Sequence, residues 1–222
     1  MAVAPKSEET ARRILDVALG LFRRDGFEGT TMREIARVAG VATGAAYYYY
    51  ESKDAIVLDF YRRASEAMQP SIEAAMERPA KLDGKLRALI QVKFAHFSED
   101  REVLRALLRN GADPKHPLSP FSSQTREIRD VDIAWFHRVL TDSGINIPRD
   151  IEPHLPGALW FMQMGVILFW VIDESPNQEK TARLLELSSK SAVLLIRIST
   201  MPLIRPLRKI VIEIIELVRA AQ

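Results

Sequence analysis

Residues 30–50 read TTMREIARVAGVATGAAYYYY, and this stretch decides the fold of the first part of the chain. Glu34 follows Thr31 by three residues, the spacing of a capping box, so a short helix is expected to begin after Thr31. Gly40 provides the positive φ that often ends a helix. Small residues then lead to four tyrosines. Two short helices joined by a glycine-containing turn indicate a helix-turn-helix.

The flanking sequence supplies the rest of a small helical domain. Upstream, a helix is expected from about Ser7 to Arg24, ended by Asp25-Gly26, and a long helix is expected downstream from about Ser52 to Met76. Ala36 lets the two short helices approach, and Val41 fills the angle between them. The first helix carries an apolar stripe formed by Ile14, Ala18, Leu21 and Phe22.

One ordered set of residues in this region resembles the signature of the Tet repressor (TetR) family of transcription regulators. The resemblance extends from about Ala11 to Ile56, and two positions depart from it. Ala42 replaces the usual capping serine, so Thr43 is expected to cap the third helix one residue late. Ala46 replaces a larger residue, whose volume Leu21 or Phe22 would fill. The residues that carry the resemblance are Phe22, Gly26, Thr31, Ile35-Ala36, Ala39-Gly40-Val41, Gly44, Tyr47, Tyr49-Tyr50 and Lys53.

The resemblance implies a set of DNA contacts. The start of the second helix and Arg33 would meet phosphate or a groove edge, and the small residues of the third helix would approach base edges. Phenols and an ammonium would bind the phosphate backbone. Packing is the alternative for the tyrosines, and Tyr49 and Tyr50 are expected to close the core. The implied DNA-binding residues are Thr31, Arg33, Thr43, Gly44, Ala45, Tyr47, Tyr48 and Lys53.

Composition limits the other classes of function. The 222 residues contain no cysteine, which removes disulfides and thiolate chemistry, and the net charge of +2 is too small to argue for nucleic-acid binding by itself. Residues 1–63 hold ten Lys or Arg and nine Asp or Glu, so DNA binding depends on where the cations lie. Met1 to Pro5 has no apolar core, no secretion signal is expected, and a cytoplasmic location is predicted.

The rest of the chain also indicates helices, and we predict an all-α fold. A helix-turn-helix domain is expected over residues 1–51, with a helical ligand-binding and dimerisation domain over 52–222. Glycine and proline clusters divide the second domain. The expected helices are Leu82–Ser98, Arg101–Arg109, Ser122–Asp142, Ile151–Asp173, Gln178–Ser199 and Pro206–Ala220.

The run from Leu155 to Ile172 is apolar on every side, which permits a membrane span by length. A core helix that meets neighbours on two sides has the same pattern, and we expect no membrane span. By resemblance, this helix and the next one pair with their mates in a homodimer. The residues expected at that interface are Phe169, Trp170, Leu187 and Leu194. A twofold dimer would read a pseudo-palindromic double-stranded DNA operator.

The segment Pro202–Gln222 is additional. Its apolar residues fall on one side of a helix, so it is expected to dock on the core or to extend the dimer interface, and an exchanged arm is the alternative. These residues are Ile204, Leu207, Ile210, Val211, Ile214, Ile215 and Val218.

The resemblance also implies a cavity for a small-molecule inducer. The available lining is apolar with few charges, which indicates a hydrophobic or aromatic ligand. An ordinary core or surface role is the alternative for each residue, and the polar candidates His96, His137 and Gln163 would orient the ligand. The predicted ligand-binding residues are Phe94, Phe97, Trp135, His137, Phe161, Gln163 and Met164.

The sequence does not favour an enzyme or a purely structural protein. Four dispersed histidines, without a metal-binding spacing, a phosphate loop or a nucleophile elbow, do not indicate an enzyme. We expect no catalytic residue, no metal and no cofactor. A purely structural helical protein would leave the first domain unexplained. The prediction is a DNA-binding transcriptional regulator, of the repressor type.

Overall fold

The computed structural model describes residues 6–108 and 113–220, and within these ranges every regular element is a helix. The all-α prediction is confirmed. The described residues up to Gln69, with those between His96 and Arg129, form one compact unit, and the remainder form a second. Helix α4, Lys53–Glu77, carries Pro70 at the point where the units divide. The functional boundary predicted between residues 51 and 52 stays a prediction.

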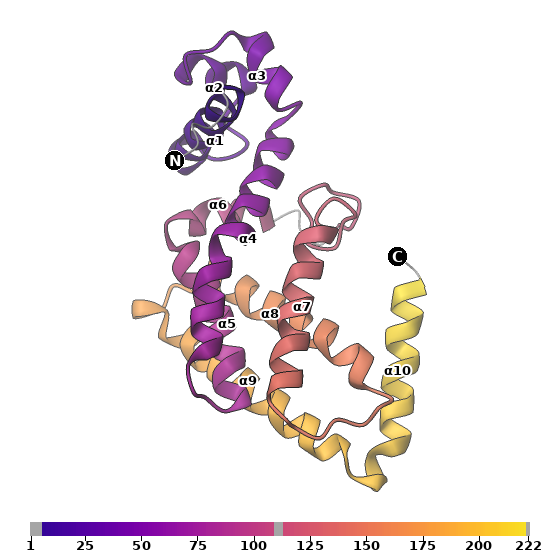
Figure 1. Cartoon of the computed structure of the whole chain (residues 1–222). Helices are drawn as coiled ribbons and strands as arrows, with labels where there is room; N and C mark the ends of the chain where they lie inside the picture. Colours follow the sequence, from indigo (N-terminus) through magenta and orange to yellow (C-terminus); the bar gives the residue numbers. More distant parts are fainter. Residues whose placement is uncertain (1–5, 109–112, 221–222) are drawn as a thin grey trace. The chain divides into compact units, whose positions relative to one another are not determined.

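The first unit contains α1 (Lys6–Asp25), α2 (Met32–Val38), α3 (Thr43–Tyr49) and the start of α4 (Figure 1). The bounds of α1 and α4 match the sequence prediction within one residue, and α2 begins directly after Thr31 as expected. All four apolar residues predicted to face inward from α1 are buried, because they repeat at helical spacing. The core of this unit also includes Ile35, Ala36, Ala46, Ile56, Val57 and Phe60.

Helix α6 (Arg101–Leu108) lies against α1 and completes this core with Val103 and Leu107. It follows the short 3-10 helix η1 (Ser98–Asp100). The Arg23 guanidinium donates to the Asp100 carboxylate, with Nε 2.8 Å from Oδ1, and Asp100 is buried. The sequence analysis placed a helix here but did not predict that it packs on α1. Arg109, its expected last residue, lies outside the described residues.

The second unit contains the remaining helices, with α8 and α9 packed together. Ile90, Val166 and Leu185 form one of its buried clusters. The elements are α5 (Leu82–His96), the main part of α7 (Arg126–Asp142), η2 (Glu152–His154), α8 (Leu155–Ile172), η3 (Pro176–Gln178), α9 (Glu179–Ser199), η4 (Pro202–Ile204) and α10 (Arg205–Ala220).

The helix predicted from Ser122 begins only at Arg126, and side-chain hydrogen bonds explain the difference. Ser122 Oγ donates to the carbonyl of Pro117 at 2.9 Å, and Thr125 Oγ1 donates to that of Ser119 at 2.7 Å. Such bonds hold the backbone in turns that compete with a helix. The helix predicted from Ile151 likewise begins later, at Leu155, after a 3-10 turn.

Candidate nucleic-acid interface and ligand pocket

The start of α2 has the cap that the sequence predicts. Thr31 is extended, with φ −117° and ψ 152°, and its Oγ1 accepts a hydrogen bond from the Glu34 amide at 3.2 Å. Met32 and Ile35 point into the core, whereas Arg33 is exposed. The first turn of α2 therefore presents Thr31 and Arg33 to solvent on a fixed helix end.

The turn between α2 and α3 depends on Gly40. Its φ is +66°, and the amides of Gly40 and Val41 donate to the carbonyls of Arg37 and Ala36 at 3.3 and 3.0 Å. This is the Schellman arrangement that ends helices at a left-handed residue. Val41 packs against the buried cluster and Ala36 lies within it, as predicted.

Helix α3 does not have the late cap that was expected from Thr43. Its N-cap position is Ala42, which makes no side-chain cap, and Thr43 is the first helical residue. The prediction was wrong because Ala42 takes the extended conformation of an N-cap, although its side chain has no oxygen to accept a hydrogen bond from the helix amides. Thr43 and Gly44 are exposed, and Ala45 is half-buried. The leading end of α3 is thus narrow and accessible.

The four tyrosines divide by exposure. Tyr47 and Tyr48 are 51% and 83% exposed, whereas Tyr50 is 6% exposed. Tyr49 packs against the buried cluster, and its ring meets that of Tyr48 edge to face at 5.3 Å. The predicted packing of the last two tyrosines is confirmed. The first two are free to meet a nucleic acid.

Tyr50 is held by a buried charged group that the sequence analysis did not identify. Its hydroxyl donates to Asp59 Oδ2 at 2.7 Å, and Arg62 and Arg63 donate to the same carboxylate. Burial and the hydrogen bond to Asp59 raise the pKa of Tyr50. Burial alone would raise the pKa of Asp59, but hydrogen bonds from Tyr50, Arg63 and Arg62 lower it. This cluster fixes the end of α3 on α4.

Lys53 also has a structural role. Its Nζ donates to the carbonyl of Phe27 at 2.6 Å and lies 4.5 Å from the centroid of the Phe27 ring. This contact ties the start of α4 to the loop after α1. An ammonium has three N–H donors, so the contact leaves donors for the predicted phosphate.

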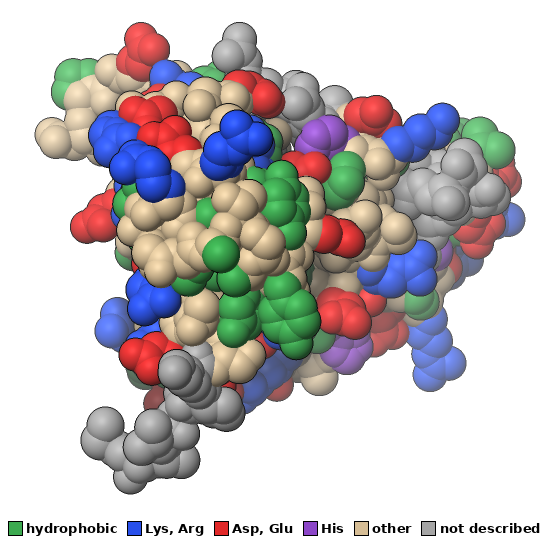
Figure 2. All heavy atoms as spheres, turned by 90° about the horizontal axis from the view of Figure 1, so that it is seen from above, with side chains coloured by type: hydrophobic (Ala, Val, Ile, Leu, Met, Phe, Trp, Pro, Cys, Tyr) green, Lys and Arg blue, Asp and Glu red, His purple; other side chains and the backbone are tan. Residues whose placement is uncertain are grey.

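Cations near α2 are partly balanced by acids. Arg24 and Arg37 each place a guanidinium nitrogen 3.7 Å from Glu34 Oε1. In the described part of the chain, Arg33 has no such ion pair. Figure 2 shows basic and acidic side chains interspersed on the face seen from above. Any attraction for DNA must therefore come from particular side chains and helix ends, as the near-neutral charge of residues 1–63 indicated.

The predicted ligand-binding residues are distributed over both units of the chain. Phe97 belongs to the first unit, where its ring lies 5.7 Å from that of Phe60. Phe161 is 52% exposed on the surface of α8, and His137 lines a smaller pocket of about 320 Å³. Phe94, Trp135, Gln163 and Met164 are partly or fully buried in the second unit. As a ligand site, the set stays a prediction.

Gln163 belongs to a buried polar cluster whose other members the sequence analysis missed. Lys93 Nζ lies 2.6 Å from Asp132 Oδ1, and Gln163 Nε2 donates to Asp132 Oδ2 at 2.9 Å. Gln163 is fully buried, and within the described ranges its Oε1 has no hydrogen-bond partner. The Asp132 carboxylate can only accept hydrogen bonds, so the Gln163 amide must point its NH2 group, and not its oxygen, toward Asp132. The Oε1 atom of Gln163 is therefore a buried hydrogen-bond acceptor without a donor on the apolar helix α8.

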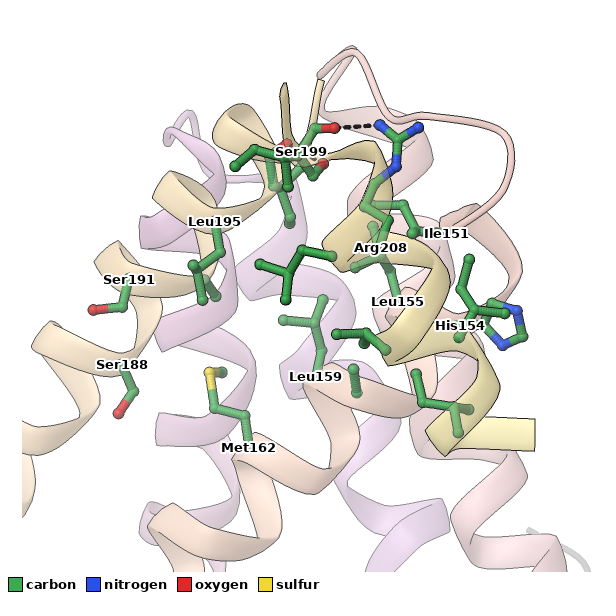
Figure 3. A pocket seen from close by; sticks show the side chains of 18 residues that line it. Ile151, His154, Leu155, Leu159, Met162, Ser188, Ser191, Leu195, Ser199 and Arg208 are labelled. Carbon is green, nitrogen blue, oxygen red and sulfur yellow. Dashed lines mark hydrogen bonds between the residues drawn. The ribbon is translucent and has the colours of Figure 1, made fainter. Parts of the chain in front are cut away.

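A larger cleft lies between α10 and the α8–α9 pair (Figure 3), with a volume of about 520 Å³. Leu155, Leu159, Met162 and Leu195 turn toward its interior in the close view. Arg208 crosses one end, where it donates to the carbonyl of Ser199. Among the lining residues that the structure describes, none was predicted to bind the ligand.

The predicted dimerisation residues fall in two groups. Leu187 and Leu194 are 45% and 57% exposed on α9. Phe169 is half-buried and Trp170 is 2% exposed. The Trp170 ring stacks on Phe94 at 4.8 Å, and its Nε1 donates to Gln178 at 2.6 Å. The accessible apolar side chains of α8 are instead Phe161, Leu168 and Ile172.

Comparison with known proteins places this geometry in a family. Residues 14–60 match the family model "Bacterial regulatory proteins, tetR family", and residues 85–214 match "Tetracyclin repressor-like, C-terminal domain". The solved structure of the transcriptional regulator FadR from Bacillus subtilis in complex with stearoyl-CoA is similar in fold. It has a TM-score of 0.59 and 18% identity, over 80% of this chain and 97% of FadR.

Two curated relatives agree. The chain is 34% identical over 95 residues to the HTH-type transcriptional regulator AcrR of Shigella flexneri, which is 42% of each protein. It is 44% identical over 112 residues to SrpR of Pseudomonas putida, or 50% of this chain and 51% of SrpR. The matches thus span about half the length of these relatives. Because the C-terminal family model covers more than half of the 222 residues, the chain belongs to the TetR family of bacterial regulatory proteins.

Proposed function

We propose that this protein is a transcriptional repressor that binds a pseudo-palindromic DNA operator as a homodimer and is released by a hydrophobic or aromatic small molecule. The observation that carries the proposal is the pair α2 and α3, joined at Gly40, with a narrow and exposed leading end on α3. An α-helix of this kind fits the major groove of B-DNA. The proposal gives no residue a catalytic role.

In this proposal α3 reads sequence and its neighbours hold the backbone. Thr43 and Gly44 are exposed and small enough to approach base edges, and Ala45 could meet a thymine methyl. The exposed phenols of Tyr47 and Tyr48 would donate to phosphates. Thr31, Arg33 and Lys53 complete the proposed phosphate contacts.

A homodimer is supported by the apolar surface of α8 and α9. Leu187 and Leu194 of α9 and Leu168 of α8 are about half exposed, an unusual amount of apolar surface to leave in water. A twofold axis through this surface would place two recognition helices roughly 34–36 Å apart, one turn of DNA. Each would read one half of the operator.

Ligand control is supported by the second unit's apolar interior and by the structural neighbour FadR, which was solved in complex with stearoyl-CoA. Gln163 Oε1, buried and unsatisfied, would accept a hydrogen bond from a ligand donor. A ligand that prefers the conformation with mismatched recognition helices shifts the dimer off DNA. In this proposal residues 1–51 bind DNA, and residues 52–222 bind the ligand and form the dimer.

We also propose a cytoplasmic protein without a membrane span. By length and composition Glu152–Ile172 could cross a membrane, and so could the bent helix pair Pro176–Ser199 and Pro202–Leu217 taken as one segment. Core helices of soluble proteins can be equally long and apolar. The buried Gln163, bonded to Asp132, favours a core role for α8.

Selection of bound duplexes from a random DNA library tests the proposal. Two inverted half-sites with centres about 10 base pairs apart are expected. The selected duplex then serves to screen hydrophobic and aromatic compounds for release of the protein. Recovery of no common sequence would contradict operator binding, and a selected operator that no compound in a broad library releases would contradict ligand control.

A further inference from the structure

Helix α10 has a broad apolar face in solvent. At 3.6 residues per turn, five side chains fall within an arc of about 120°. They are Leu207, Ile210, Val211, Ile214 and Leu217, exposed by 56%, 54%, 43%, 55% and 73%. In a globular protein, a helix normally packs an apolar stripe of this width against the protein core. We call these five residues the outer arc.

The opposite edge of α10 attaches it to its own unit. Arg208 donates to the Ser199 carbonyl, and its Nε lies 3.0 Å from Asp150 Oδ2. Ile212 and Ile215 are half-buried beside it. These contacts lie along one edge of the helix, whereas the side chains of the outer arc are 43% to 73% exposed.

The outer arc is continuous with the apolar surface of α8 and α9. Leu207 and Val211 belong to the arc and also line the cleft of about 520 Å³, together with Ala158 of α8 and Leu195 of α9. Leu195 is 65% exposed, and Leu194 beside it is 57% exposed. One apolar surface thus runs from α10 across the cleft to the proposed dimer interface.

We propose that a second copy of this chain fills the cleft and covers the outer arc, so that α10 is an arm of the dimer. This inference rests on the proposed homodimer and adds a second contact region to it. Small residues line the α9 side of the cleft, at Ser188, Ser191 and Ala192. Small side chains allow a helix backbone to approach closely, so the cleft suits a helix of another protomer.

Two other occupants fit the observations less well. A small molecule in the cleft would leave Ile210, Ile214 and Leu217 in water. A lipid surface favours a polar face rich in Lys and Arg. Among the α10 residues whose side chains the structure describes, the exposed charges are instead balanced, with Arg205 and Lys209 against Glu213 and Glu216.

The first test compares two charge-neutral double variants of the full chain. Ile210→Lys with Ile214→Glu places charges in the outer arc, and Lys209→Glu with Glu213→Lys exchanges charges on the polar face. Both pairs are solvent-exposed, and unchanged far-UV circular dichroism checks that both variants fold. By sedimentation equilibrium, the first variant should raise the dimer dissociation constant by about tenfold or more, and the second should not.

The second test identifies the occupant. A photo-crosslinking amino acid at position 214 should give a covalent dimer of the purified protein, and the same group in place of Glu213 should not. A crosslink only within one chain would overturn the proposal, because α10 would then close on its own unit. Binding to vesicles of phosphatidylcholine and phosphatidylglycerol, lost in the outer-arc variant, would also overturn it.

The outcomes separate this inference from the proposed function. A wild-type protein that is dimeric and binds operator, with an outer-arc variant of unchanged dimer affinity, would refute the arm and leave the proposed function intact. A wild-type protein that remains monomeric at all concentrations and binds no operator would refute the homodimer itself.

Discussion

Replacing Tyr50 by phenylalanine tests the division of the tyrosine run most sharply. The change removes the hydroxyl that donates to Asp59 at 2.7 Å and keeps the ring, which is 6% exposed. A hydrogen bond to a charged group contributes about 1.5–3 kcal/mol. Arg62 and Arg63 still satisfy Asp59 in the variant. We therefore expect the free energy of unfolding to fall by about 1–2 kcal/mol, toward the lower part of that range.

Urea denaturation at one fixed protein concentration measures this change, because the stability of a dimer depends on concentration. The midpoint should fall and the m-value should stay constant. Tyr48→Phe is the matched control, since its ring is 83% exposed, and its unfolding free energy should change by less than about 0.5 kcal/mol.

The pH dependence follows from the raised pKa of Tyr50, which is caused by burial and by the hydrogen bond to Asp59. A raised folded pKa means that the contribution of this group to stability is complete below about pH 10, the ordinary tyrosine value. It is lost as the pH rises above that value. The stability difference between wild type and Tyr50→Phe should thus shrink in alkali.

Acid acts on the same cluster through Asp59, whose pKa is lowered by its hydrogen bonds despite burial. Its contribution is present above about pH 4 and is lost as the pH falls through the folded pKa. The two variants should differ in the opposite way in DNA binding. Tyr48→Phe should lower the affinity for DNA, whereas folded Tyr50→Phe should not. Unchanged stability in Tyr50→Phe, or equal loss of DNA affinity in both variants, would refute this reasoning.

Three further predictions concern other contacts. Lys93→Met should lower the free energy of unfolding by about 2–3 kcal/mol, because the nearly buried Asp132 loses its cation and keeps only the hydrogen bond from Gln163. Adding Asp132→Leu should recover part of the loss, and urea denaturation measures both changes. Thr31→Ala should cost about 1 kcal/mol of stability through loss of the cap, measured as a lower thermal midpoint. Lys53→Ala should weaken binding to all DNA sequences alike and reduce the salt slope by about 1, whereas Thr43 variants should change sequence preference in a gel-shift series.

A specific outcome would contradict each of these three predictions. A double variant at Lys93 and Asp132 that is no more stable than Lys93→Met would argue against the ion pair as the cause. An unchanged midpoint in Thr31→Ala would show that the cap contributes nothing. For Lys53→Ala, the contact with Phe27 means that folding must be checked first. An unchanged salt slope in the folded variant would count against the phosphate contact.

Much of the first unit could be predicted because its signals are local. Capping at Thr31, the positive φ of Gly40 and the stripe of α1 each follow from residues a few positions apart. The late cap at Thr43 was wrong because the choice of N-cap depends on the backbone conformation of Ala42, which the residue type does not reveal.

The second unit was harder because its contacts are distant in sequence. α8 is apolar on every side, so periodicity could not show that Trp170 faces inward and Phe161 outward. Lys93 and Asp132 are ordinary charged residues in sequence and become a buried pair only through the packing of α5 against α7. The amphipathic pattern of α10 predicted an apolar side, but not that it would lie in solvent.

In the proposed function, α3 of each protomer reads half of a palindromic DNA site. The most direct test of this proposal is fluorescence anisotropy of the wild-type protein with the selected operator and with a copy in which one half-site is scrambled. We expect scrambling to lower the affinity by about a hundredfold or more at physiological salt, since each mismatched base pair costs roughly 1–3 kcal/mol. Equal affinity for the two duplexes would contradict it.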